Sequence, residues 1–411
     1  MDQRVTFGQV FAQPVFRVVF LTRSLAIGAD VLRMVALSVL VFSATGSALL
    51  GAVAFGISFA PQVVGGVLLG ALPDRVRPRP LLVVGYLMEA AVAAALGLLG
   101  LPVWACLLLV GLVAAVSPVF NGTAGRLTAD VLHGEAFVLG RSTMQLAASG
   151  AQVLGMAGGG IAVAALGPEA ALLVVAGCHL VAALGVRLFL PDRPAIGAGG
   201  QSLVAQSWRG NRVLLADRRV RRLLLAMWLP PAFVTAAESL LVPYGAARGW
   251  SAGTPGLVLA CVPVGMIVGN LVVGRWLTPR ARERLTGPLA MLLGVPLTLF
   301  ALDLPVPAVG ALLAVTGCGF AYSLCLQRPF RDAVPDDNRG QAFGLLSTGL
   351  MTAQGLGPLV WGLLTELVPV PVAVMLGGVA GVGIACWLIG KQPQLRIDTP
   401  AGNRRVDVET R

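Results

Sequence analysis

The chain has 411 residues, of which 56% are hydrophobic and 12% are charged. A soluble globular protein carries about 25% charged residues, so this composition excludes an ordinary water-soluble domain and indicates a membrane protein. The net charge of +11 does not indicate a nucleic-acid partner, because the basic residues alternate from loop to loop rather than gather in one patch.

Apolar stretches long enough to cross a bilayer, about 20 residues each, recur about twelve times. They cover residues 16–42, 48–72, 81–99, 103–120, 143–166, 170–190, 223–244, 256–277, 288–302, 306–326, 343–364 and 370–389. We therefore predict an all-α polytopic membrane protein with about twelve transmembrane helices.

The basic residues predict how the chain is oriented. Arg248 is the one basic residue in the loops at 43–47, 98–102, 165–169, 245–255, 303–305 and 367–369. Arg23 and Arg33 lie inside the first span, and the other Lys and Arg residues gather on the opposite side. By the positive-inside rule that side is cytoplasmic and holds both termini, so we expect a multi-pass protein of the cytoplasmic (inner) membrane.

The stretch IGADVLRMVAL at 27–37, inside the first span, contains two ionisable groups. Asp30 and Arg33 are three residues apart and share a helix face, and Arg23 extends the stripe by about two turns. An aspartate in mid-bilayer costs about 2.5 to 3.5 kcal/mol on insertion scales, so Asp30 needs a partner or a cavity. Asp30 and Arg33 are either a permanent structural pair or a coupling site whose aspartate exchanges its proton.

Three other ionisable residues lie within apolar spans. Glu238 in the seventh span is the nearest equivalent of Asp30 in the second half, and we count it with Asp30 and Arg33 as a proton-coupling candidate. For Glu89 in the third span we favour a buried pairing role over coupling. For His179 a buried histidine bonded to a neighbour and a proton relay are the two interpretations.

A polar face is also predicted on the fifth span. Gln145, Ser149 and Gln152 are spaced by four and three residues, which places them on one side of a helix. They line either a substrate cavity or a wetted seam between helices, and the spacing favours neither.

The chain divides into two similar halves. We predict an N-terminal half at 1–190, a cytoplasmic linker at 191–222, a C-terminal half at 223–390 and a cytoplasmic tail at 391–411. An offset of about 204 residues aligns Gly65 with Gly269 and Gly70 with Gly274. Parallel repeats of this kind are typical of secondary transporters.

The sequence contains no motif for phosphate binding or metal binding. The one lysine, Lys391, is followed by Gln392, so no phosphate-binding Gly-Lys-Ser/Thr loop is present. The two histidines have no metal-ligand spacing around them. We therefore expect no ATPase, no enzyme active site, no metal and no prosthetic group.

The loop after the second span, GALPDRVRPR at 70–79, resembles the signature of the major facilitator superfamily. The matching residues include Gly70, Asp74, Arg75 and Arg79, which the resemblance implies form a cytoplasmic latch. The usual glycine and first following arginine are replaced by Arg77 and Pro78. Alternatively, the arginines only obey the positive-inside rule.

The fifth span contains GMAGGG at 155–160, which resembles the antiporter signature Gly-Pro-x-x-Gly-Gly with methionine in place of proline. Small residues let membrane helices approach closely, so we expect Gly155, Gly159 and Gly160, with Gly357 in the eleventh span, to pack helices together. The missing proline weakens the inference of export over import.

Three longer stretches are similar to bacterial drug exporters of the macrolide-efflux type: LAIGADVLRMVAL, ESLLVPYG and NRGQAFGLLSTGLMTAQGLG. The resemblance implies the major facilitator fold and a monomer that exports lipophilic small molecules, coupled to protons, by alternating access in a lipid bilayer. An importer or facilitator of the same fold, or a membrane sensor or scaffold that does not transport, are the alternatives. The sequence does not identify the substrate, and nothing in it indicates nucleic-acid binding.

The predicted topology can be tested with reporter fusions after Ala252 and after Arg404. We expect them to report opposite sides of the membrane, because the loop at 245–255 lies opposite the basic side. The same side for both fusions would contradict the count of about twelve spans.

Overall fold

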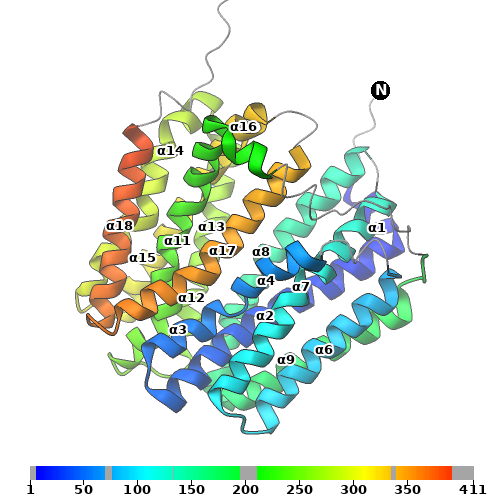
Figure 1. The fold of residues 1–411 in the computed structure, drawn as a ribbon, viewed down its shortest axis with the longest axis horizontal. Coiled ribbons are helices and arrows are strands. Elements are labelled where there is room, and N and C mark those ends of the chain that lie inside the picture. The colour runs from blue at the N-terminus through cyan, green and yellow to red at the C-terminus, as the bar shows by residue number, and fades with distance from the viewer. Residues whose placement is uncertain (1–5, 70–75, 133, 195–210, 335–338, 391–411) are drawn as a thin grey trace, which may run out of the picture.

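The computed structural model describes residues 6–69, 76–132, 134–194, 211–334 and 339–390 (Figure 1). In this part of the chain the regular elements are helices, and no strand is present. The all-α prediction is confirmed.

The helices form two groups that follow each other in the chain (Figure 1). The N-terminal half contains α1 (Phe7–Ala12), α2 (Pro14–Thr45), α3 (Ala48–Gly56), α4 (Ala60–Leu69), α6 (Pro78–Leu98), α7 (Val103–Val131), α8 (Gly134–Leu166) and α9 (Pro168–Phe189). The C-terminal half contains α11 (Arg218–Ala246), α12 (Thr254–Leu259), α13 (Cys261–Leu271), the π-helical η1 (Val272–Trp276), α14 (Pro279–Gly294), the 3-10 helix η2 (Val295–Ala301), α15 (Val306–Gly319), α16 (Tyr322–Ala333), α17 (Arg339–Leu364) and α18 (Val370–Gly390).

In the described part of the chain, 11 helical segments are long and apolar enough to cross a membrane. The remaining predicted span, 343–364, is present as α17, which has 26 residues but is interrupted by polar side chains such as Thr352 and Gln354. α17 packs against α11, α3 and α4, so other helices surround much of its length. This explains how a less apolar helix is accommodated.

Several predicted spans are not single helices. The second breaks after Gly56 into α3 and α4, the eighth divides into α12, α13 and η1, and the tenth into α15 and α16. The ninth changes from α14 to the 3-10 helix η2 at Val295, next to Pro296. Because proline has no N–H, it cannot continue the α-helical hydrogen-bond pattern at that point.

One packing contact is repeated in the two halves. The Cα of Gly65 in α4 lies against the backbone of Ala115 in α7, and the Cα of Gly269 in α13 lies against the backbone of Cys318 in α15. A Cβ at either glycine would clash with a carbonyl oxygen, so each helix pair depends on the missing side chain. The glycines that align in the sequence therefore make equivalent contacts.

The two halves join at one end of the molecule. There α3 packs against α17 and α11, and α8 packs against α12. Met34, Phe55 and Met156 of the N-terminal half share a buried cluster with residues of the C-terminal half such as Leu241 and Tyr244. These contacts lie beside the short loops at 43–47, 165–169 and 245–255.

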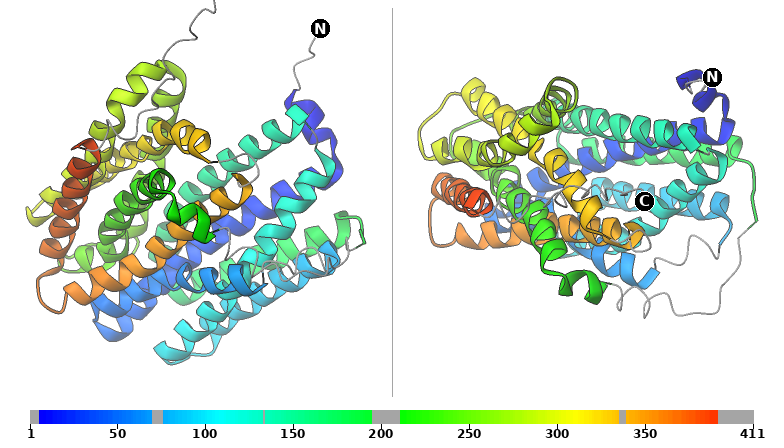
Figure 2. Two further views of the ribbon diagram at one scale, coloured as in Figure 1. Left: turned by 45° about the horizontal axis from the view of Figure 1, so that its top comes forward. Right: turned by 90° about the horizontal axis from the view of Figure 1, so that it is seen from above.

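Toward the opposite end the halves diverge, as Figure 1 and the left view of Figure 2 show. The buried clusters of described residues at that end each belong to one half: one around Leu127 and Tyr86, one around Phe16, and one around Tyr322 and Phe330. The structure is therefore closed at the end with the short loops and separated at the end where α9 ends and α11 begins.

Candidate functional site

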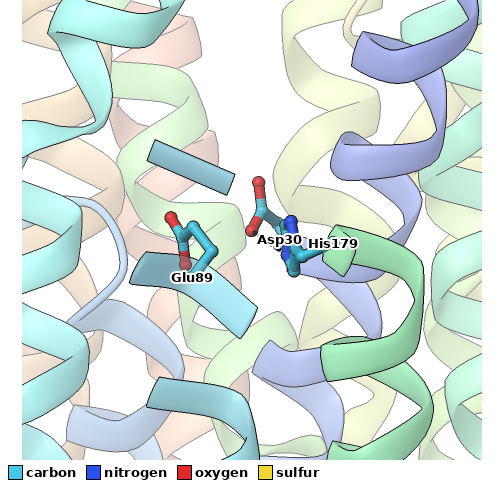
Figure 3. Close-up of side chains that lie close together, drawn as sticks. All are labelled: Asp30, Glu89 and His179. Carbon is cyan, nitrogen blue, oxygen red and sulfur yellow. Dashed lines mark ion pairs between the residues drawn. The ribbon is translucent and has the colours of Figure 1, made fainter. Parts of the chain in front are cut away.

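Four ionisable side chains meet inside the N-terminal half. Asp30 and Arg33 come from α2, Glu89 from α6 and His179 from α9, and Asp30, Glu89 and His179 each lie near the middle of their helix. Figure 3 shows the carboxylate of Asp30 beside the ring of His179, with Glu89 across from them. We call these four residues the charge cluster.

Arg33 is shared between two carboxylates. Its Nη2 lies 3.3 Å from Oδ1 of Asp30, the partner three residues away that the sequence predicts. Its Nη1 donates a hydrogen bond to Oε2 of Glu89, which is 56 positions away in the sequence. The Arg33 side chain is 3% exposed, so protein groups rather than water must satisfy its charge.

Glu89 is enclosed more completely than Asp30. Its side chain is 7% exposed, and the hydroxyl of Ser117 on α7 lies 3.4 Å from Oε1. Buried carboxylates in a membrane are stabilised by such pairs and hydrogen bonds. This geometry agrees with the pairing role that the sequence favours for Glu89.

His179 completes the charge cluster from the opposite side. Its Nε2 lies 3.4 Å from Oδ1 of Asp30, and its ring stacks on Tyr86 at a centroid distance of 6.2 Å. The His179 side chain is 1% exposed, whereas that of Asp30 is 35% exposed. Asp30 is therefore the member of the charge cluster that reaches the surface of the described protein.

The charges of the charge cluster do not balance unless a proton is present. Two carboxylates face one guanidinium, so the sum is one negative charge when His179 is neutral and zero when it is protonated. An uncompensated charge in the middle of a membrane protein is expensive, and these four side chains sum to zero when one proton is bound to them.

The donor atoms of Asp30, Glu89 and His179 lie within 4.8 Å of one another, a spacing that is also compatible with a metal ion. However, Arg33 already forms ion pairs with both carboxylates. A divalent cation would lie against this fixed positive charge, which disfavours metal binding. The arrangement suits a proton better than a metal.

The other candidate polar residues lie apart from the charge cluster. Glu238 is partly buried in α11, and no hydrogen bond or ion pair of its carboxylate is found among the described residues. Ser149 and Gln152 are partly exposed on α8, and the side chain of Gln145 lies outside the described ones. Arg23 is partly buried on α2, about two turns before Asp30.

The four candidate glycines all lie at close helix contacts. In α8, Gly155 meets the backbone of Gly28 in α2, Gly159 meets Leu32 in α2, and Gly160 meets the backbone of Gly253 and Gly256 beside α12. In α17, Gly357 meets the side chain of Thr235 in α11. Gly155 thus fixes the approach of α8 to α2 just beside Asp30.

The predicted latch lies mostly outside the described residues, which exclude Gly70, Asp74 and Arg75. Of its neighbours, Arg77 pairs with Asp192 at 3.2 Å and Arg79 donates to the carbonyl oxygen of Arg187. Both contacts join the start of α6 to the end of α9 within one half, so they say nothing about a bond between the halves.

Comparison with known proteins agrees with this architecture. Residues 19–330 match the family model described as Major Facilitator Superfamily. This chain belongs to the major facilitator superfamily. It is therefore a transporter of the major facilitator type. A search of curated protein sequences finds no match.

Several solved structures of transporters share its fold. The nucleoside transporter NupG is 14% identical, with a TM-score of 0.75 over 92% of this chain and 98% of its own. A POT family transporter in complex with 5-aminolevulinic acid is 11% identical, with a TM-score of 0.76 over 97% and 99%. A bacterial homolog of the human lysosomal transporter Spinster, inward-facing and unoccupied, is 12% identical, with a TM-score of 0.67 over 93% and 96%.

Because two carboxylates share the buried Arg33, we expect removal of the Arg33 side chain to destabilise this major facilitator protein strongly. We expect Arg33→Leu to lower the free energy of unfolding by about 3 to 5 kcal/mol, because it leaves buried carboxylates without a counter-charge. The double variant Arg33→Leu/Glu89→Leu should recover most of that loss. Thermal unfolding of the purified protein in detergent measures both effects.

Arg77→Leu is the matched control. Arg77 also pairs with an aspartate, but its side chain is 66% exposed, and exposed ion pairs contribute little to stability. Equal destabilisation by Arg33→Leu and Arg77→Leu would contradict the assigned role of Arg33.

Proposed function

We propose that this chain is a proton-coupled exporter of lipophilic small molecules, which it moves across the cytoplasmic membrane by alternating access. The observation that carries the proposal is the charge cluster, because an ionisable group at mid-depth of a membrane protein is a functional site by default. The membership in the superfamily supports transport, and the sequence resemblance to drug exporters supports the direction and the class of substrate.

Asp30 is the group that we assign to proton exchange. It combines partial exposure with a nearby fixed cation, Arg33, so its proton can be gained or lost as its surroundings change. Arg33 supplies the counter-charge in the ionised state. Glu238 offers a second carboxylate in α11, and we assign it a secondary role in coupling or in binding the substrate.

The contact between the halves supports alternating access. At the closed end, Gly160 meets Gly253 and Gly256, and Gly56 meets Gly355 and Pro358. Such surfaces of small residues have few interlocking side chains, so they can separate and form again at modest cost. If the basic side is cytoplasmic, this structure is open toward the cytoplasm.

An importer or facilitator of the same fold is the second candidate. The structural neighbours include a nucleoside transporter, so a polar substrate is compatible with this fold. A sensor or scaffold that does not transport is less well supported, because it has no need for a costly charge cluster in its membrane-spanning part.

The first experiment identifies a substrate and the second tests coupling. A drug-susceptibility panel compares cells with and without the protein, and the compound with the largest difference is then used in inverted vesicles. We expect Asp30→Asn to bind this compound but to lose its accumulation driven by a pH gradient, because asparagine cannot exchange a proton. Glu238→Gln should cause a milder or substrate-selective defect.

Glu366→Gln is the control, because Glu366 is an exposed carboxylate beyond α17 and away from the charge cluster. It should accumulate the compound as the unchanged protein does. Normal accumulation by Asp30→Asn against a gradient would place the proton site elsewhere and make Glu238 the next candidate.

A further inference from the structure

We propose that His179 is a second proton-binding group of the charge cluster, and that Asp30 and His179 share one proton across the 3.4 Å between Oδ1 and Nε2. Its relevance to transport rests on the proposed function, but the shared proton is a property of the protein alone. His179 on α9 thereby becomes part of the coupling site.

The burial of His179 supports this assignment. The ring is 1% exposed, and neither Nδ1 nor Nε2 has a hydrogen-bond partner among the described residues. A buried imidazole without any hydrogen bond is unfavourable, whereas a small movement brings Nε2 into hydrogen-bond distance of Asp30. Oδ1 of Asp30, the oxygen that faces Nε2, is also buried and has no hydrogen bond within the described part of the chain.

Glu89 is a poorer choice for the mobile proton. Arg33 and Ser117 already bind its two oxygens, and it is largely enclosed. Asp30 makes no comparable hydrogen bond to Arg33, whose Nη2 is 3.3 Å from it. The cluster thus divides into a fixed pair, Arg33 with Glu89, and an exchangeable pair, Asp30 with His179.

Titratable and charged side chains near the exchangeable pair come from α2 itself and from helices packed around it. Arg23 and Arg33 lie on α2 itself, and α6 contributes Tyr86 and Glu89. α9 contributes His179 and the neighbouring Cys178, and α7 contributes the neutral Ser117. α1, α3 and residues 142–166 of α8 contain no titratable residue. Glu238, the one acidic residue of α11, has no hydrogen bond or ion pair with the exchangeable pair among the described residues.

The resulting proton path has two steps. A proton from the surface protonates the carboxylate of Asp30, which is 35% exposed, and then passes from Oδ1 to Nε2 of His179. The imidazolium lies next to the restored carboxylate, so the cluster is neutral in both positions of the proton. Storage on His179 keeps the proton away from the surface while the halves change position.

The small number of histidines makes the proposal directly testable. The chain contains two, so in a His133→Gln background His179 is the remaining one. Nuclear magnetic resonance of the isotope-labelled imidazole then follows His179 in the purified protein as the pH is varied. We expect the signal to titrate, and we expect Asp30→Asn to move its midpoint by about one pH unit or more, because the imidazolium loses its nearest anion.

Asp192→Asn is the control, since Asp192 is an exposed carboxylate that pairs with Arg77 at the end of α9, and it should leave the midpoint unchanged. The double variant Asp30→Asn/His179→Gln lacks both holders of the shared proton, and the purified protein should then take up about one proton fewer per molecule on acidification. A His179 signal that does not titrate, or a midpoint that is the same with and without Asp30, would overturn the proposal.

The titration of His179 and the transport experiment can give different answers. If His179 titrates together with Asp30 but Asp30→Asn still accumulates substrate against a gradient, the shared proton exists and the proposed coupling is wrong. If His179 does not titrate but Asp30→Asn abolishes accumulation, the coupling stands and Asp30 acts without His179.

Discussion

The ion pairs of Arg33 with Asp30 and Glu89 are the constraint on which the N-terminal half depends. They join α2 to α6 at mid-depth, where a membrane protein has no water to stabilise a lone charge. His179 brings α9 to the same point, and Gly155 lets α8 approach α2 beside Asp30. One set of charges therefore both holds the helices together and gives this half its chemistry.

The two halves share a packing plan but not this chemistry. Gly65 and Gly269 make equivalent contacts, which agrees with a duplicated unit. Yet the nearest counterpart of Asp30, Glu238, has no cation or histidine beside it among the described residues. We infer that the halves have diverged into one that holds a proton site and one whose carboxylate is available for another role.

The sequence predicted the helical class, the near-twelve spans and the contact between Asp30 and Arg33, because these depend on composition or on spacing within one helix. It did not predict that Glu89 and His179 join them, since such contacts depend on which helices are neighbours in space. The sequence did contain a usable signal: Asp30, Glu89 and His179 each lie near the middle of a span, where an ionisable residue needs a partner. Breaks such as the one at Gly56 were missed because apolar composition continues across them, and the latch residues Gly70, Asp74 and Arg75 lie outside the described part.

The central claim is that one carboxyl group of the charge cluster, that of Asp30, gains and loses a proton while that of Glu89 stays bound to Arg33. Infrared difference spectra of the purified protein in lipid, recorded between high and low pH, detect a carboxyl group when it becomes protonated. We predict a carboxyl band that is absent in Asp30→Asn and retained in Glu89→Gln. A band that persists in Asp30→Asn and disappears in Glu89→Gln would contradict the account.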